Sequence, residues 1–308
     1  MSTEKAVVSR MTHAPAEVAL EYGAAESAER KRFGTPRQKG LLLLAPAVIV
    51  AVLFSLIPLA YLVQVSLTKE SSYFFGAEYT FDNYREVWER YPPAVGITLY
   101  LAAVSSLINL VFGYPFAYIL VRKIRYRELV RTMMTFPLFG PLYLAFGMFY
   151  LLLPTGPLGP IFKFLGINTA KYLISQGAVL FAMAVFTFPF MVMNIGAALT
   201  NVDPMLEEAA RTLGAKPWQI FVRILFPLSW SGIVAGFLMC FGWNLGVFAQ
   251  AQLLGTPREQ AVLSIQIFMK GMAQFNYGLA AALGVLLMVL AFAVTWVSLR
   301  FSRGALGA

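Results

Sequence analysis

The chain has 308 residues, of which 59% are hydrophobic and only 13% are charged, and its net charge is +9. In soluble domains about a quarter of the residues are charged. The composition of this chain therefore excludes a soluble globular protein and predicts a bundle of membrane helices. The single cysteine, Cys240, excludes an intrachain disulfide, and the single histidine, His13, excludes a zinc site of clustered histidines and cysteines.

The first 39 residues are polar and contain seven of the Lys and Arg residues. They lack the apolar stretch of a cleavable signal peptide. We therefore expect residues 1–39 to form a cytoplasmic tail that basic side chains hold at the inner membrane surface. An alternative is a short helix over Glu17–Arg32, whose basic C-terminal end would suit the helix dipole.

Six segments are long and apolar enough to cross a membrane, for which about 20 consecutive apolar residues are needed. None of them contains Asp, Glu, Lys or Arg, and a charge at the bilayer centre costs about 2.5–3.5 kcal/mol even on insertion scales. The sequence therefore predicts an all-α integral membrane protein with a six-helix transmembrane domain over residues 40–308. The predicted spans are Leu41–Val63, Ala94–Val121, Thr132–Leu153, Ala178–Leu199, Ser229–Gln252 and Tyr277–Leu299.

Lys and Arg residues predict the orientation of these spans, because cytoplasmic loops carry an excess of them. With the N-terminus in the cytoplasm, the inner parts of the chain hold 17 of the 24 basic residues and the outer loops hold 7. Six crossings then place both termini in the cytoplasm. Topology thus accounts for the positive net charge, and no nucleic-acid partner is expected. The short connection between the second and third spans contains Arg122, Lys123, Arg125, Arg127 and Arg131.

Two outer connections and three prolines give further local predictions. Thr68–Pro93 is rich in aromatic residues, which fits either a belt at the membrane interface or a docking surface for another protein. Ile161–Ile167 is apolar but too short to span, so we expect an interfacial or re-entrant helix there. Pro137 and Pro141 in the third span and Pro189 in the fourth predict kinks.

The inner connection Asn201–Pro227 predicts two short helices rather than a simple tether. Asp203 can cap the first helix, and Pro204 fits its first position, where no N–H is needed. Gly214 is placed to end this helix in a left-handed conformation. Pro217 can begin the second helix, and we expect Pro227 to break it before the fifth span.

The first of these helices has distinct faces. Glu207 and Arg211 form a favourable i,i+4 pair of opposite charges, and the acids Glu207 and Glu208 lie near the positive end of the helix dipole. An apolar stripe at helical spacing lies beside them. It consists of Leu206, Ala209, Ala210 and Leu213.

The same connection carries a spaced pattern that reads E-A-A, three residues, G, nine residues, I-x-L-P. The chain resembles the permease subunits of binding-protein-dependent ABC importers in this EAA loop, and Phe226 stands where that family usually has Leu. The resemblance extends from about residue 40 to 300 in the number of spans, the orientation and the position of the loop. The matching residues are Glu208, Ala209, Ala210, Gly214, Ile224 and Pro227.

The resemblance implies a type I ABC importer permease fold, with the EAA loop at 201–227 as a coupling helix that docks on a cytoplasmic ATPase. It further implies two ATPase subunits, a second permease subunit (a paralogue is favoured), an external solute-binding protein, and a multi-pass location in the lipid of a bacterial inner membrane. An alternative is that the loop packs against the inner ends of its own chain. The expected ATPase-coupling residues are Glu207, Glu208, Ala209, Ala210, Arg211, Gly214, Ile224 and Pro227.

The sequence offers no catalytic machinery of its own. It contains no G-x-x-x-x-G-K-[ST] phosphate loop, no G-x-S-x-G and no H-E-x-x-H. We therefore expect a transport component rather than an enzyme. No catalytic residue, metal or cofactor is assigned to this chain, and ATP and magnesium are expected on the partner ATPase subunits.

Polar residues inside the predicted spans are candidates for the substrate pathway, since polar groups in lipid need partners. The alternative is interhelical hydrogen bonding, which we favour for Ser105, Ser106 and Asn194. The spans contain no carboxylate and no arginine, which favours an ATP-driven importer over an ion-coupled carrier or a voltage sensor. The pathway candidates are Asn109, Tyr118, Trp243, Asn244 and Gln250.

The end of the fifth span suggests a substrate class. Phe248–Gly255 resembles the polyamine, opine and iron branch of these permeases. The expected solute is small and polar, with a polyamine, opine or amino acid as the best match and a sugar as the alternative. Aromatic rings could hold an organic cation by cation–π contact. Two other functions remain open: a receptor or assembly factor that does not transport, and a membrane-embedded enzyme.

Overall fold

The computed structural model describes residues 36–69, 78–164, 166, 175–255 and 261–305. The regular structure of these residues is helical, apart from one isolated antiparallel bridge between Thr68 and Tyr79. Most of the predicted tail, residues 1–35, lies outside the described residues. Helix α3 (Pro36–Ser66) begins within the end of that tail and covers the first predicted span.

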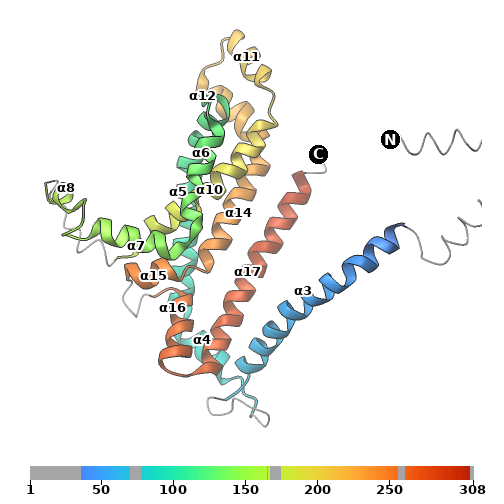
Figure 1. The fold of residues 1–308 in the computed structure, drawn as a ribbon, viewed down its shortest axis with the longest axis vertical. Coiled ribbons are helices and arrows are strands. Elements are labelled where there is room, and N and C mark those ends of the chain that lie inside the picture. The colour runs from blue at the N-terminus through green and yellow to red at the C-terminus, as the bar shows by residue number, and fades with distance from the viewer. Residues whose placement is uncertain (1–35, 70–77, 165, 167–174, 256–260, 306–308) are drawn as a thin grey trace, which may run out of the picture. The chain divides into compact units, whose positions relative to one another are not determined.

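The chain divides into two compact units, Met1–Tyr61 and Leu62–Ala308. In the second unit, α5, α10 and α14 pack against one another and α17 packs against α14 (Figure 1). Helices α5, α10 and α17 confirm the second, fourth and sixth predicted spans as helical segments. The bounds of these helices and of α14 are α5 (Pro92–Arg122), α10 (Gln176–Thr200), α14 (Trp230–Leu245) and α17 (Tyr277–Ala305).

Four helices of the described residues are long and apolar enough to cross a membrane. The qualifying stretches are Val48–Ser66, Pro92–Arg122, Gln176–Thr200 and Tyr277–Val297. A fifth crossing is formed if Pro217–Leu228 and Trp230–Leu245, which are bent by 71° at their junction, are taken as one span. The structure therefore supports four or five of the six predicted crossings by length and composition.

The third predicted span is not one helix. It divides into α6 (Arg127–Met134), the 3₁₀ turn η1 (Phe136–Phe139) and α7 (Pro141–Leu152). Pro137 and Pro141 have no N–H to continue a helical ladder, and Gly140 between η1 and α7 is extended. The 12 residues of α7 rise about 18 Å, which is short of the roughly 30 Å hydrocarbon core. The expected kinks at Pro137 and Pro141 are thus complete breaks.

The fifth predicted span is also shorter than expected. Helix α14 ends at Leu245, and the chain turns before α15 (Ala249–Leu254). After α15 the described chain continues as α16 (Leu263–Phe268) and a π-helical turn, η4 (Met269–Ala273), before α17. The sequence remains apolar through the turn between α14 and α15, so the sequence pattern alone does not reveal that turn. After α7, α8 (Gly159–Phe164) covers the described part of the predicted short interfacial helix up to Phe164.

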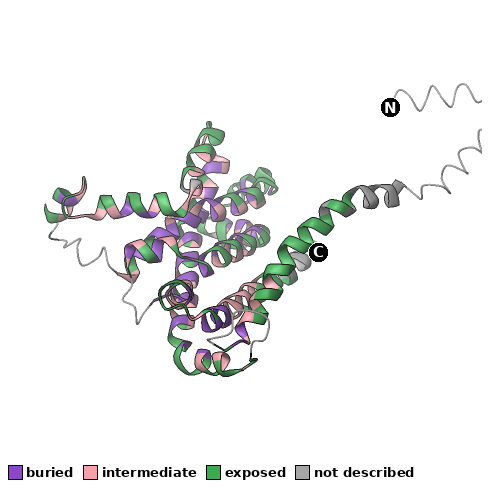
Figure 2. Cartoon of the chain, turned by 60° about the horizontal axis from the view of Figure 1, so that its bottom comes forward, coloured by how far each residue is buried: buried purple, intermediate pink, exposed green. Residues whose placement is uncertain are grey.

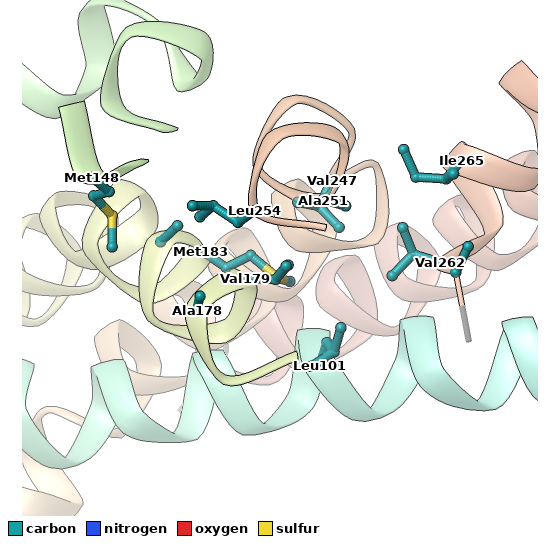
Figure 3. Packing of buried hydrophobic residues seen from close by; sticks show 12 residues of the cluster. Leu101, Met148, Ala178, Val179, Met183, Val247, Ala251, Leu254, Val262 and Ile265 are labelled. Atoms are coloured by element: carbon teal, nitrogen blue, oxygen red, sulfur yellow. The ribbon is translucent and has the colours of Figure 1, made fainter. Parts of the chain in front are cut away.

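A buried apolar cluster holds these short helices on the bundle. Figure 3 shows Leu101 of α5 and Met183 of α10 facing residues of α7, α15 and α16. Burial is concentrated where the helices of the second unit face one another, and exposed residues lie on the outer faces (Figure 2). The cluster includes Met148, Ala178, Val179, Val247, Ala251, Leu254, Val262 and Ile265.

Candidate functional site

The predicted start and end of the first inner-loop helix are confirmed. Helix α11 spans Pro204–Thr212, with Pro204 in its first turn. The side chain of Asp203 accepts a hydrogen bond of 2.9 Å from the backbone N–H of Met205, which satisfies one of the free amides of the first turn. Gly214 has a φ of +79°, a left-handed conformation that glycine adopts without a steric penalty.

The second half of the loop is a helical run that ends just after Pro227. After α12 (Pro217–Ile220) come a π-helical turn, η2 (Phe221–Leu225), and α13 (Phe226–Leu228). Pro227 lies near the end of this run, which stops one residue later at Leu228. The run and α14 are bent by 71° at their junction, so the predicted break before the fifth span is present directly after Pro227.

The apolar face of the loop is uncovered. Leu213 is 89% exposed, Met205 70% and Trp218 60%. Helices α11 and α12 lie at the end of the second unit opposite α4 (Asp82–Arg90) and α16 (Figure 1). Glu208 and Ala209 are exposed on the same helix, whereas Ala210 and Ile224 are partly buried. Large exposed apolar groups on a polar-rimmed helix are typical of a protein-binding surface.

Glu207 differs from the exposed Glu208 because it is buried, with only 4% of its surface exposed. Arg122 Nε donates to one of its carboxylate oxygens at 2.9 Å, and the Tyr118 hydroxyl donates to the other at 2.9 Å. Arg211 Nη2 lies 3.7 Å from the same carboxylate, as the i,i+4 spacing predicted. The sequence did not reveal the pairing with Arg122, although Tyr118 and Arg122 are themselves four residues apart on α5.

A second polar cluster ties three bundle helices together. Asn109 Nδ2 of α5 donates to Thr187 Oγ1 of α10 at 2.8 Å. Asn244 Nδ2 of α14 donates to Ser105 Oγ at 2.8 Å and to Thr187 Oγ1 at 3.3 Å. All four residues are buried. The structure thus brings together two of the pathway candidates, Asn109 and Asn244, as interhelical hydrogen-bonding groups.

The remaining pathway candidates lie apart from this cluster. Tyr118 contacts Glu207, and Gln250 is buried on α15. Trp243 is 54% exposed and stacks on Phe190, with ring centroids 5.7 Å apart and ring planes at 8°. It borders a hollow of about 960 Å³ between α10, α14 and α17, whose wall also includes Asn194 and Thr295. An aromatic face bordering a hollow can hold an apolar or cationic group.

The described residues contain no group of three or more His, Cys, Asp or Glu side chains that could hold a metal ion.

Comparisons with known proteins show the family of the chain. Residues 109–306 match the family described as binding-protein-dependent transport system inner membrane component. The spermidine/putrescine transport system permease protein PotB of Haemophilus influenzae is 30% identical over 259 residues, which cover 82% of this chain and 90% of the relative. PotB of Escherichia coli is 29% identical over 256 residues, covering 80% and 92%.

A solved structure shares the fold. It is a bacterial alginate ABC transporter in complex with an alginate pentasaccharide-bound periplasmic protein, and one of its chains is similar to this one with a TM-score of 0.72. The similarity covers 90% of this chain and 96% of the other, at 23% sequence identity.

Proposed function

Because the chain belongs to the binding-protein-dependent transport system inner membrane components, we propose that it forms half of the translocation pathway of an ATP-driven importer. It is a permease subunit of an ABC importer and a transport component, not an enzyme. The energy comes from two cytoplasmic ATPase subunits, which hold the ATP and magnesium. A second permease subunit, a paralogue of this chain, completes the pathway, and an external binding protein delivers the solute at the bacterial inner membrane.

The observation that carries this proposal is the uncovered apolar face of the loop. Leu213, Met205 and Trp218 are mostly exposed, whereas the loop is fixed to its own chain from the other side through Glu207. A partner groove that receives this face would remove apolar surface from water, which stabilises a complex by about 25 cal/mol per Å². Glu208 lies beside the face and can pair with a basic group of the ATPase.

The test is purification of the permease with its nucleotide-binding subunit. The double variant Glu208→Lys with Gly214→Pro reverses one charge of the docking surface and introduces a residue whose φ is fixed at about −65° where the chain needs +79°. We expect the variant to lose the ATPase subunit and solute uptake. Intact association and uptake would contradict the proposal.

Glu78→Lys provides a matched control for this experiment. Glu78 is an exposed acid paired with Lys69 at 3.3 Å in the predicted outer loop. The same charge reversal there should leave the ATPase subunit bound. Loss of the ATPase from both variants would show that charge reversal acts non-specifically, and the coupling role of the loop would then be rejected.

Contacts of the described residues support six crossings. Arg122 Nη2 at the end of α5 donates to the carbonyl of Val202, just after α10, at 2.7 Å. The C-terminal ends of α5 and α10 therefore lie together, so these two helices run in the same direction. The chain between them must return across the bundle, and α6, η1 and α7 make this return as a broken crossing. Six crossings put both termini on the same side, and the excess of Lys and Arg in the connections on that side supports a cytoplasmic location.

We propose that the solute is a small organic cation of the polyamine type. Both PotB relatives are named for spermidine and putrescine. The exposed ring of Trp243 lies beside the hollow between α10, α14 and α17 and can hold a cation by cation–π contact. Such a contact needs no carboxylate in the pathway. Asn109 and Asn244 support the wall of the pathway from inside the bundle, through their buried hydrogen bonds.

Uptake of labelled solutes distinguishes the alternatives. Cells that lack this chain should lose import of spermidine or putrescine, and the restored gene should return it. Import of a sugar in place of polyamines would identify a sugar-class permease. If no ATPase subunit co-purifies and no solute enters proteoliposomes, the chain is a receptor or assembly factor, and the transport proposal is overturned.

A further inference from the structure

One face of α5 contacts the coupling loop at its beginning, middle and end. Tyr114, Tyr118 and Arg122 are spaced four residues apart, which places their side chains above one another on one helix face. Arg122 contacts the start of the loop at Val202, and Arg122 and Tyr118 together hold Glu207 in its middle. This face of α5 therefore contacts the loop near its start and at Glu207.

The end of the loop is held by Tyr114. Its hydroxyl lies 2.8 Å from Ser229 Oγ, directly before α14. Its ring meets Phe221 edge-on, with centroids 4.9 Å apart. Ile220 and Leu225 of the loop are buried in the same apolar cluster as Tyr114. The inner end of α5 and the coupling loop thus share a packed interface.

Glu207 and Arg122 provide the charged part of this interface. Their side chains are only 5% and 15% exposed. A buried charge left without its partner is strongly unfavourable, because the interior solvates it poorly. The pair therefore disfavours any movement that separates α11 from α5, whereas an exposed pair is weakened by solvent and salt.

We infer that Glu207 and Arg122 are positioning residues that join the coupling helix to α5, so that a displacement of α11 by the ATPase is transmitted directly to a membrane-spanning helix. This inference rests on the proposed docking of the loop on an ATPase. It gives the adjacent acids different roles: Glu208 faces the partner, and Glu207 faces the chain's own α5.

The test measures solute imported per ATP hydrolysed by the complete transporter in proteoliposomes. Glu207→Gln removes the charge but keeps the size of the side chain. We expect the variant to retain its ATPase subunits and to import about fivefold less solute per ATP, at the lower end of the coupling between sites in proteins. A merely structural role would reduce the amount of assembled transporter and leave this ratio unchanged.

A double-mutant cycle tests whether the two residues act as one unit. Arg122→Gln should lower the ratio to a similar degree, and the double variant should be no worse than either single variant, because contacting residues are non-additive. Multiplied losses in the double variant would show independent roles and overturn the inference. Arg122→Lys, which retains the charge, should restore part of the coupling.

Two further variants keep the outcome unambiguous. Glu128→Gln breaks an exposed pair with Arg131 on α6 and should leave the ratio unchanged.

Tyr118→Phe removes only the hydroxyl group that donates to the carboxylate of Glu207, so it should fold even if Glu207→Gln does not. We expect about a twofold loss of the ratio in this variant. A normal ratio in Tyr118→Phe and Glu207→Gln, with the ATPase bound, overturns the inference that Glu207 and Arg122 couple α11 to α5. It does not overturn the proposed function. Absence of an ATPase from the parent complex overturns both.

Discussion

Thr187 joins three helices through one hydroxyl group. The group donates to the carbonyl of Met183 and accepts from Asn109 and Asn244. Thr187→Val keeps the shape of the side chain but removes the acceptor shared by the side-chain amides of Asn109 and Asn244. Loss of a buried hydrogen-bond partner costs about 1–3 kcal/mol. We expect thermal unfolding in detergent to show a lower midpoint for this variant.

Ser106→Ala is the matched control for Thr187→Val. Ser106 is also fully buried, but its hydroxyl donates only to the carbonyl of Ala102 in its own helix. Its midpoint should fall less than that of Thr187→Val. Equal midpoints for Thr187→Val and the parent would show that the cluster does not stabilise the bundle.

Trp243 is the residue at which the substrate class can be tested. If its exposed ring holds an organic cation, Trp243→Leu should raise the apparent KM for spermidine uptake by about two- to thirtyfold, which corresponds to a cation–π contact of about 0.5–2 kcal/mol. Trp243→Phe should retain part of the affinity, because it keeps an aromatic face. A KM that is unchanged in Trp243→Leu would remove this ring from the pathway.

At the scale of elements, α10 and α14 approach closely at Gly232. A Cβ atom there would lie 2.5 Å from Ala198 Cβ and 2.6 Å from the carbonyl oxygen of Asn194. Gly232→Ala must therefore separate the two helices, and overpacking of this kind costs about 1–3 kcal/mol. Gly242→Ala on the same helix meets no atom within 4 Å and should not lower the unfolding midpoint. A parent-like midpoint for Gly232→Ala would argue against this close packing.

Elements with strong local signals could be predicted from the sequence, and the others could not. The cap at Asp203 and the left-handed turn at Gly214 depend on neighbouring residues, so their chemistry is visible in the sequence. The third span looked continuous because apolarity reports burial in lipid and not the continuity of a helix. Pro137, Gly140 and Pro141 act together to break it, whereas Pro189 lies within the continuous helix α10.

At the scale of the whole molecule, the orientation can be tested with cysteine labelling. The sole cysteine, Cys240, is buried and should not react with a membrane-impermeant maleimide. Trp88, 83% exposed on α4, and Tyr126, 71% exposed after α5, are predicted to lie on opposite sides of the membrane. Trp88→Cys should be labelled in intact cells, and Tyr126→Cys only after permeabilisation. The reverse pattern would invert the topology.

The sequence by itself determined the uncharged apolar segments, the uneven distribution of basic residues between the connections and the local form of the loop at 201–227, because these features follow from transfer free energies and from contacts between near neighbours. The tertiary structure decided which polar groups meet. Helices such as α5 are apolar on most faces, so their sequence does not indicate which face turns inward. Only packing could show that Glu207 pairs with Arg122, that Glu208 is exposed, and that Asn109 and Asn244 share Thr187.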